Sequence, residues 1–411
     1  MALRIAIVGG GIGGLAFALS LHRAGLACDV YESAPEVREI GVGITLLPHA
    51  MRELAALGLQ APLEAAGIEN FESVFCNRWG QFIYREPRGR HAGYELPEVG
   101  LHRGKLHGVM YAAALERLGP DRVHLGHRCA GVEQDQRRAV VRFEDGKGET
   151  LPPVEADIVV ACDGVNSSVR RGFYPGEKLA FGGINTWRGV TLHPPILTGK
   201  SYLRIGSIDT GKMVIYPIAD NADGKGNQLV NWVAEMRREG AAMNDWNQPG
   251  HPDDFVSIFQ NWRFDWLDVP QLIRGAAAIF EYPMVDRDPV ARWTFGRITL
   301  LGDAAHPMYP RGSNGSAQAL IDARVLAELV ASSADPLEAL AEYERQRLPA
   351  TSRIVQTNRT VPPDYIIMKV DALTGGRPFG KLDDVISQAE LQRVSDEYKA
   401  IAGFSIEALK N

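Results

Sequence analysis

The chain has 411 residues, of which 45% are hydrophobic and 23% charged, and a formal net charge of −6. This length exceeds what one core usually fills, so we expect two domains, and the composition is that of an ordinary globular protein. A mildly acidic chain offers no basic surface for nucleic acid or an anionic membrane, and no run of about 18 apolar residues predicts a membrane span.

The start of the chain predicts a β-α-β unit. Residues 3–8 form a short apolar run, residues 12–24 have helical periodicity, and the sequence CDVYE at 28–32 is typical of a second strand. This stretch could be mistaken for a signal peptide, but its glycines fall at motif spacing, so we do not expect secretion.

The loop between the first strand and the helix reads G-x-G-x-x-G at Gly9, Gly11 and Gly14. Gly9 permits a tight turn, Gly11 lets the backbone approach a pyrophosphate, and Gly14 allows the helix to touch the strand. The helix N-terminus adds free N–H groups and a partial positive charge. Glu32 ends the second strand, where its carboxylate can bind ribose hydroxyls and would repel a 2′-phosphate. The loop therefore predicts a site for NAD or FAD, without separating the two, and disfavours NADP.

The next segments continue the α/β pattern. Helices fit residues 48–57 and 103–118, and a strand near 157–162 places Asp163-Gly164 at its tip. Ligands gather at the carboxyl ends of strands in open α/β sheets, which favours a binding role for Asp163. The alternative is that Asp163 caps the helix that carries Arg170.

From about residue 180 to 285 the pattern is strand-like and rich in aromatic residues. Two interpretations stay open at this point: the core of a sheet, which composition alone slightly favours, or the wall of a pocket for a flat ligand. The aromatic residues concerned are Trp187, Tyr202, Tyr216, Trp232, Trp246, Trp262, Trp266 and Tyr282.

The α/β pattern returns after residue 286. A strand at 297–301 leads into Gly302-Asp303, a small polar loop follows, and a helix fits 316–333. The simplest architecture is a nucleotide-binding domain assembled from separate chain segments, with an aromatic-rich sheet inserted between them.

The three loops GGGIGG, CDGVNSSVR and GDAAHPMYPRGSNG together resemble the fingerprint set of the FAD-dependent aromatic hydroxylases, the class A flavoprotein monooxygenases with a p-hydroxybenzoate hydroxylase-like fold. Their order and spacing match over about residues 3–350. Within this group, REIGVGITLLPHA, TWRGVT, YPMVDRDP and RITLLGDAAHPMYP look most like phenazine-modifying monooxygenases of the 5-methylphenazine-1-carboxylate type, with salicylate hydroxylases more distant.

The resemblance implies a Rossmann-like FAD-binding domain, an inserted mixed β-sheet substrate domain and a helical C-terminal region. The expected boundaries are 1–70, 98–178 and 286–350 for the FAD-binding domain, 71–97 and 179–285 for the substrate domain, and 351–411 for the C-terminal region.

The resemblance also implies roles for matching residues. Glu32 would bind the ribose of the AMP half of FAD, Asp163 would support the cofactor and the encounter with NAD(P)H, and Asp303 would hydrogen-bond the ribityl chain. Arg103 would reach the flavin phosphate or ribityl region, unless it is a surface residue at a helix start. The full expected cofactor set is Gly9, Gly11, Gly13, Gly14, Glu32, Arg38, Arg103, Asp163, Asp303, Pro310, Gly312, Asn314 and Gly315.

The implied activity is hydroxylation of a small aromatic or N-heteroaromatic molecule, with or without a carboxylate, through a flavin C4a-hydroperoxide. It would use tightly but non-covalently bound FAD, transient NADH or NADPH, and O₂. The helix after RGSNG would direct its N-terminal dipole at the reduced flavin, an effect of roughly 0.3–2 kcal/mol. The site must also exclude water, so the aromatic region is now expected to line a pocket. We expect a cytoplasmic monomer or homodimer, since Cys28, Cys76, Cys129 and Cys162 contain no C-x-x-C pair and suit a reducing compartment.

Candidate substrate residues are Trp187, Arg188, Tyr202 and Tyr216, and Arg188, Arg204 and Arg311 are candidates to pair with a substrate carboxylate, although a solvated Arg is the default for each. His306 and Tyr309 are catalytic candidates by position, with a structural role beside Pro307 and Pro310 as the alternative. His193 and His251 are unconvincing as bases, so a substrate activated by a ring nitrogen or an amino group is favoured. A flavin reductase of the same fold and a non-catalytic FAD-binding protein remain alternatives.

Overall fold

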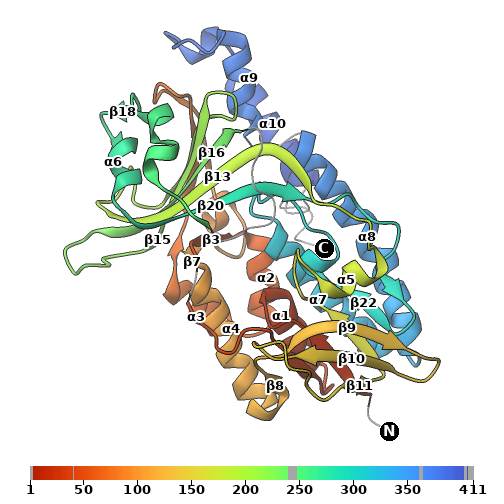
Figure 1. Ribbon diagram of the computed structural model, residues 1–411. Helices are drawn as coiled ribbons and strands as arrows, with labels where there is room; N and C mark the ends of the chain where they lie inside the picture. The colour runs from red at the N-terminus through yellow and green to blue at the C-terminus, as the bar shows by residue number, and fades with distance from the viewer. Residues whose placement is uncertain (1–2, 40, 239–247, 361–363, 402–404, 406–411) are drawn as a thin grey trace.

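The computed structural model describes residues 3–39, 41–238, 248–360, 364–401 and 405. Two large sheets and their helices make up the molecule (Figure 1). Four of the expected helices are confirmed within two residues: α1 (Ile12–Arg23), α2 (Pro48–Ala56), α4 (Arg103–Leu118) and α7 (Gly315–Ser332). The expected α/β class is confirmed as well.

The first large sheet has the strand order β21-β22-β12-β1-β2-β8. Every residue of β1 is buried, because α1 and its neighbours cover the sheet and parallel strands need both faces covered. β21 is antiparallel to β22, and the other pairs are parallel. The strands are β1 (Ile5–Val8), β2 (Asp29–Tyr31), β8 (Val123–His124), β12 (Ile158–Ala161), β21 (Thr294–Phe295) and β22 (Ile298–Leu300).

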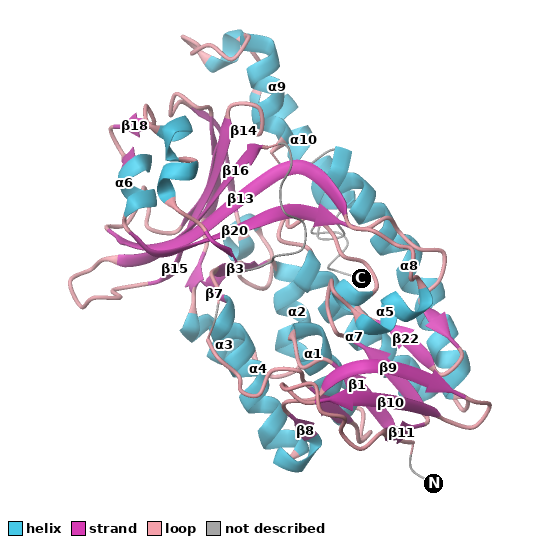
Figure 2. Ribbon diagram, in the orientation of Figure 1, coloured by secondary structure: helices cyan, strands magenta, loops and turns pink. Residues whose placement is uncertain are grey.

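The second large sheet is mixed and curved, and it arches beside α2 and α7 (Figure 2). Only the β14–β5 pair is parallel. In spatial order the strands are β17 (Gln248–Pro249), β20 (Ala276–Asp286), β13 (Ala180–His193), β16 (Gln228–Arg237), β15 (Gly211–Ala219), β14 (Ser201–Ser207), β5 (Glu72–Cys76) and β6 (Phe82–Pro87).

The outer face of this second sheet, the face turned to α6 (Val269–Arg274), carries an aromatic core. Trp187, Trp232 and Trp262 are buried there against Phe255 and Phe259. For these tryptophans the structure supports the sheet-core interpretation rather than a pocket wall. Trp246 lies outside the described residues.

Three smaller sheets complete the strands. The orders are β11-β10-β9, β3-β7-β4 and β18-β19. Their bounds are β3 (Gly43–Leu46), β4 (Ile68–Glu69), β7 (Val99–His102), β9 (Arg128–Gln134), β10 (Ala139–Glu144), β11 (Val154–Ala156), β18 (Arg263–Phe264) and β19 (Leu267–Asp268).

The last part of the chain is helical, as expected. α8 (Pro336–Thr360) packs on α7 and continues through residue 350, where a boundary was expected. α9 (Tyr365–Thr374) and α10 (Gln388–Ile401) pack on the β5–β6 end of the second sheet. The remaining helices are α3 (Gln60–Ala66) and α5 (Ser168–Phe173), with short 3-10 turns at Gly89–Ala92, Pro120–Arg122, Pro252–Asp254, Val256–Phe259, Gly302–Ala304 and Leu382–Asp384. Within the described ranges, no helix is both long and apolar enough to cross a bilayer.

Candidate functional site

The three motif loops leave the first sheet side by side. Val8 at the end of β1 pairs with Ala161 of β12, and Ala161 pairs with Leu300 of β22. Val8 also pairs with Tyr31 of β2. The residues after these strands therefore gather at one carboxyl edge, which is where open α/β sheets bind ligands.

The phosphate loop follows β1, and two of its glycines have no room for a side chain. A Cβ on Gly9, whose φ is +105°, would lie 2.4 Å from the Cys162 carbonyl oxygen, and a Cβ on Gly14 would lie 1.9 Å from the Gly9 carbonyl oxygen. Gly11 instead faces open space, and no side chain caps α1 there. The first N–H groups of α1 are thus open to an anion, which fits the pyrophosphate of a dinucleotide. Gly13 faces Leu301 and Ala319, a position that serves the packing of α1 on α7.

Glu32 lies beside this loop with a fixed carboxylate. Its Oε2 accepts a hydrogen bond from the Gly10 N–H at 2.7 Å, and its Oε1 accepts one from the Ala34 N–H at 2.8 Å. The side chain is half-buried. A carboxylate held this way at the end of β2 fits the ribose position expected from the sequence.

His107 is a contact to the phosphate loop that sequence reasoning missed. Its Nε2 lies 2.7 Å from the Gly10 carbonyl oxygen. Because a carbonyl only accepts, Nε2 must donate this bond. Arg103 is exposed one turn earlier on α4. Because residues four apart lie on the same side of a helix, the expected role of Arg103 could have indicated His107. Arg38 is also exposed, where it pairs with Glu36.

Asp163 has one satisfied and one free carboxylate oxygen. Its Oδ2 accepts from the Ser168 N–H at 2.8 Å and the Val169 N–H at 3.3 Å, the first N–H groups of α5, whose N-cap is Ser167. Its Oδ1 is buried and has no hydrogen-bond partner among the described residues. Burial raises the pKa of this carboxyl group. The free oxygen is available to a ligand at the carboxyl edge.

Arg170, in the same motif, connects the second loop to the third. Its Nη1 donates to the carbonyl oxygens of Ala304 at 3.0 Å and Ala305 at 2.6 Å. Its Nε donates to Glu177 at 2.7 Å, which holds the guanidinium in place. The sequence placed Arg170 correctly after the Asp-Gly motif, but only the fold reveals this link.

The third loop presents Asp303 and a second open helix N-terminus. Asp303 is exposed, and a Cβ on Gly315 would lie 3.9 Å from its Oδ1. Gly312 and Ser313 both have left-handed backbone, with φ of 73° and 54°. Such a conformation is uncommon outside glycine and is often found at functional loops. The N-cap of α7, Asn314, makes no capping hydrogen bond with its side chain, and Pro310 is exposed nearby.

His306 lies beneath this loop rather than in it. It is buried, and its Nε2 lies 2.5 Å from Oδ2 of Asp322, whose Oδ1 accepts from Arg347 Nε at 2.6 Å. Oδ2 of Asp322 also accepts from the Gly302 N–H at 3.3 Å. The positive partners hold the pKa of Asp322 below its usual range despite burial. This geometry favours the structural alternative for His306.

The side chain of Asn314 belongs to the same buried network. Its Oδ1 accepts from Gln318 Nε2 at 3.1 Å and from His49 Nε2 at 3.0 Å. Gln318 in turn accepts from Arg347 Nη2 at 2.6 Å. Hydrogen bonds from α2 and α8 thus hold the start of α7, the helix that follows the third loop.

Tyr309 and Arg311 are also buried. Tyr309 packs with Ile184, Ile208 and Met284 of the second sheet, and burial raises the pKa of its phenol. Arg311 lies near α8, with Nη1 3.5 Å from the Asn358 carbonyl oxygen. These contacts join the third loop to its surroundings and favour the structural alternative for Tyr309.

The four predicted substrate residues do not share one face of the second sheet. Successive side chains of a strand point to opposite faces, so Trp187 and Arg188 lie on opposite sides. Trp187 stacks on Phe255 on the outer face, with ring centroids 4.8 Å apart. Tyr202 and Tyr216 stack on each other at 5.0 Å on the other face, which we call the inner face. Trp187 is therefore separated from the other three predicted residues by the sheet.

Arg204 shares the inner face but is already engaged. Its Nη1 donates to Ser73 Oγ at 2.6 Å, and its guanidinium lies over the rings of Tyr202 and Phe75 at 4.5 and 4.9 Å. His193 and His251 lie away from these groups, near Pro194 and Asp253.

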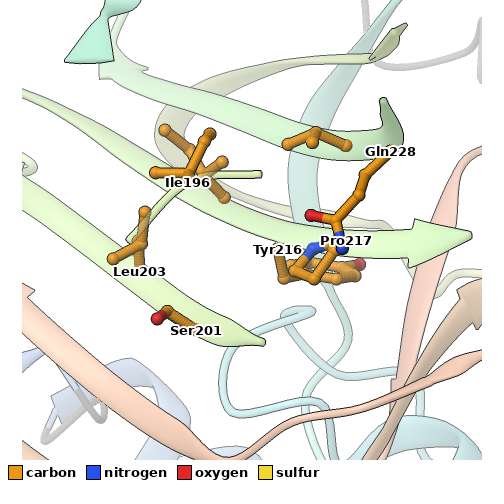
Figure 3. Close-up of a pocket in the computed structure, with 8 residues that line it drawn as sticks. Ile196, Ser201, Leu203, Tyr216, Pro217 and Gln228 are labelled. Carbon is orange, nitrogen blue, oxygen red and sulfur yellow. The ribbon is translucent and has the colours of Figure 1, made fainter. Parts of the chain in front are cut away.

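Figure 3 shows a small pocket beside β14, β15 and β16. Its volume is about 180 Å³ with space open to solvent included. Of the four predicted substrate residues, Tyr216 alone lines it, so this pocket does not define the substrate site. It is lined by Ile196, Ser201, Leu203, Ile215, Tyr216, Pro217, Gln228 and Val230.

A Rossmann-like sheet with three ligand loops, joined to a mixed sheet with an aromatic inner face, defines a flavoprotein class. A family model described as FAD binding domain matches residues 2–198 and 279–358. The phenazine 1,6-dicarboxylic acid hydroxylase of Lysobacter antibioticus is 38% identical over 403 residues, 97% of this chain and 96% of that protein. A 3-amino-4-hydroxybenzoate 2-monooxygenase of Streptomyces platensis is 34% identical over 363 residues, 87% of each chain.

The fold has a close counterpart among solved structures. HpxO of Klebsiella pneumoniae, complexed with FAD and uric acid, aligns with a TM-score of 0.74 at 23% identity over 99% of this chain and 97% of that one. The chain belongs to the FAD-binding-domain family, within the class A flavoprotein monooxygenases that hydroxylate aromatic rings. The family expected from the three loops is confirmed.

Proposed function

We propose that this chain hydroxylates a small carboxylated aromatic or N-heteroaromatic molecule, phenazine- or salicylate-like, at the expense of NAD(P)H and O₂. The observation that carries the proposal is the pair of open helix N-termini, α1 and α7, at the edge where the three loops meet. FAD suits both helix N-termini, because its pyrophosphate is anionic and its flavin ring carries negative charge on reduction. The names of the two relatives, each of which acts on a carboxylated ring, support the substrate class.

In this proposal different residues bind different parts of FAD. The N-terminus of α1 holds the pyrophosphate, Glu32 the adenosine ribose, and Asp303 the ribityl chain, while the backbone from Gly312 to Gly315 lies along the flavin ring. When bound, FAD supplies the hydride acceptance and oxygen activation. Arg103, exposed at the start of α4, would reach the flavin phosphate or ribityl region, and Arg38, which pairs with Glu36, would lie near the pyrophosphate.

The substrate would lie between the third loop and the inner face, with Arg188, Tyr202 and Tyr216 toward it. The buried aromatic side chains there keep water out. We assign no general base, because His306 is bound to Asp322 in the interior. The substrate must therefore carry its own activating ring nitrogen, amino or hydroxyl group.

We keep the expected domain boundaries as part of the proposal, in which strands from 72–87 and 180–286 build the substrate-facing sheet. We also propose a cytoplasmic location, because the reaction draws on NAD(P)H and the cysteines are free thiols. The proposed oligomeric state is a monomer or a homodimer.

The test is to measure NADH, NADPH and O₂ consumption by the FAD-loaded protein with carboxylated phenols, pyridines and phenazines. We expect ring-stimulated oxidation that yields more hydroxylated product than H₂O₂. Stimulated oxidation without O₂ uptake would indicate a reductase, and no turnover with either nucleotide would indicate a binding protein.

A further inference from the structure

Two buried polar atoms on the inner face have no hydrogen-bond partner in the described part of the chain. They are Nε of Arg188 and Nδ2 of Asn231. Buried polar groups are nearly always paired in folded proteins, so two neighbouring groups without partners indicate that a ligand completes them.

The two residues lie close together beside Tyr216. Asn231 pairs in register with Tyr216 on one side and Val190 on the other, and Arg188 precedes Val190 by two residues on the same face of β13. Burial raises the pKa of the Tyr216 phenol, and the charge of Arg188 and a side-chain hydrogen bond with Thr45 oppose that rise. Polar side chains from β3, β13, β15 and β16 therefore lie together on the inner face.

Arg188 is a cation without an acid. Within the described residues, no carboxylate lies within ion-pairing distance of its guanidinium, and Tyr282 lies beneath it at 5.2 Å. Glu235 is the nearby acid, but it pairs with Lys212 at 3.1 Å. Burial lowers the pKa of Arg188, as expected for a desolvated cation. Arg188 is half-buried and its Nε is sealed from solvent without a partner among the described residues, so it calls for an anion from outside the chain.

Asn231 is oriented to donate. The Gly43 N–H donates to its Oδ1 at 2.7 Å, so that oxygen is occupied and the amide nitrogen faces away from it. The side chain is fully buried. Arg188 and Asn231 thus both offer N–H groups, which suit the oxygens of a carboxylate.

We propose that Arg188 and Asn231 form a subsite for a ring carboxylate of the substrate. The inference rests on the proposed function, because it takes the inner face as the substrate face. It selects Arg188 among the three arginines considered from the sequence, since Arg204 and Arg311 already have partners within the chain.

The test compares binding of two matched pairs, phenazine-1-carboxylate with phenazine-1-carboxamide and salicylate with salicylamide, to the FAD-loaded protein by perturbation of the flavin spectrum. The wild type should bind at least one acid about tenfold or more tightly than its amide, as expected for a charge-assisted contact. Arg188→Met should bring acid and amide within about twofold, with the amide affinity little changed. Asn231→Leu should weaken the acid by about fivefold, consistent with one lost hydrogen bond.

The control is Arg204→Met, which removes a buried arginine of the same face and should keep the preference for the acid. A wild type without any acid preference, or an Arg188→Met protein that retains it, would overturn the subsite. Because the readout is binding, it stands apart from the proposed function: acid-selective binding without turnover would contradict the reaction and leave the subsite intact.

Discussion

Asp303 is an exposed carboxylate between a buried strand and an open helix N-terminus. We expect Asp303→Ala to weaken FAD binding by roughly tenfold to a hundredfold, because a hydrogen bond to a charged group contributes about 1.5–3 kcal/mol. The measurement is fluorescence titration of the FAD-free protein with FAD. Asp121→Ala, a change at another exposed aspartate, should leave the affinity unchanged. Equal affinity in the Asp303→Ala and wild-type proteins would remove Asp303 from the cofactor site.

His107 is the residue that ties α4 to the phosphate loop through the Gly10 carbonyl. His107→Leu should reduce FAD affinity about fivefold, since one neutral hydrogen bond contributes about 1 kcal/mol. His107→Gln, which can still donate, should recover part of the loss. The same titration measures both variants, and no difference between Leu and Gln would show that the hydrogen bond does not act on FAD affinity.

At the scale of elements, helices α2, α7 and α8 hold the third loop through a buried polar network that includes His49. Burial lowers the pKa of His49 to about 4, although its hydrogen bond to Asn314 opposes the shift. An unfolded histidine takes up its proton near pH 6.5, so this group favours the folded state above that pH and loses the advantage as the pH falls toward 4.

Acidification should therefore destabilise the protein through His49. From pH 8 to pH 5 we expect a loss of about 2 kcal/mol in unfolding free energy from this group, an order-of-magnitude figure. Urea denaturation of the wild type and His49→Gln at both pH values measures it. The variant should lose less stability on acidification, and an identical loss in both proteins would exclude His49 as the cause.

The elements that the sequence predicted well are those with local signals. α1, α2, α4 and α7 have clear helical periodicity, and α2 carries Pro at its start. The three loops were found because each follows an apolar strand at a fixed spacing. His107 and Arg170 were missed as contacts, because their partners lie 97 and 134 residues away in the chain, which no local pattern encodes.

For the whole molecule, the sequence could place the aromatic residues in the middle region but not on a face. That assignment needs the strand register, which separates Trp187 in the outer core from Arg188, one residue later, on the inner face. Asn231 and Thr45 gave no signal in the sequence, because only the folded chain brings them beside Arg188 and Tyr216. The family fingerprint could predict the fold, whereas the set of residues on the inner face follows only from the strand register of the folded chain.

The C-terminal helices are joined to the second sheet by a buried ionic group. Lys212 Nζ lies 3.1 Å from both Glu235 Oε2 and Asp364 Oδ2, just before α9. Lys212→Met should destabilise the protein by about 3–5 kcal/mol, because it leaves two buried carboxylates without a cation. Arg237→Met, which breaks an exposed pair with Asp209 on the same sheet, should cost less than about 1 kcal/mol. Denaturant unfolding compares them, and similar losses would contradict the role of the buried group.

Insertion of one atom of molecular oxygen into an aromatic ring is the reaction proposed for the whole molecule. The deciding measurement is mass spectrometry of the product formed by the FAD-loaded protein from phenazine-1-carboxylate and salicylate, each tested separately with NADH or NADPH under oxygen-18 gas. We expect a hydroxylated ring that contains one heavy oxygen atom. A product whose new oxygen comes from water, or NAD(P)H oxidation that yields only H₂O₂ with every ring tested, would contradict the proposed reaction.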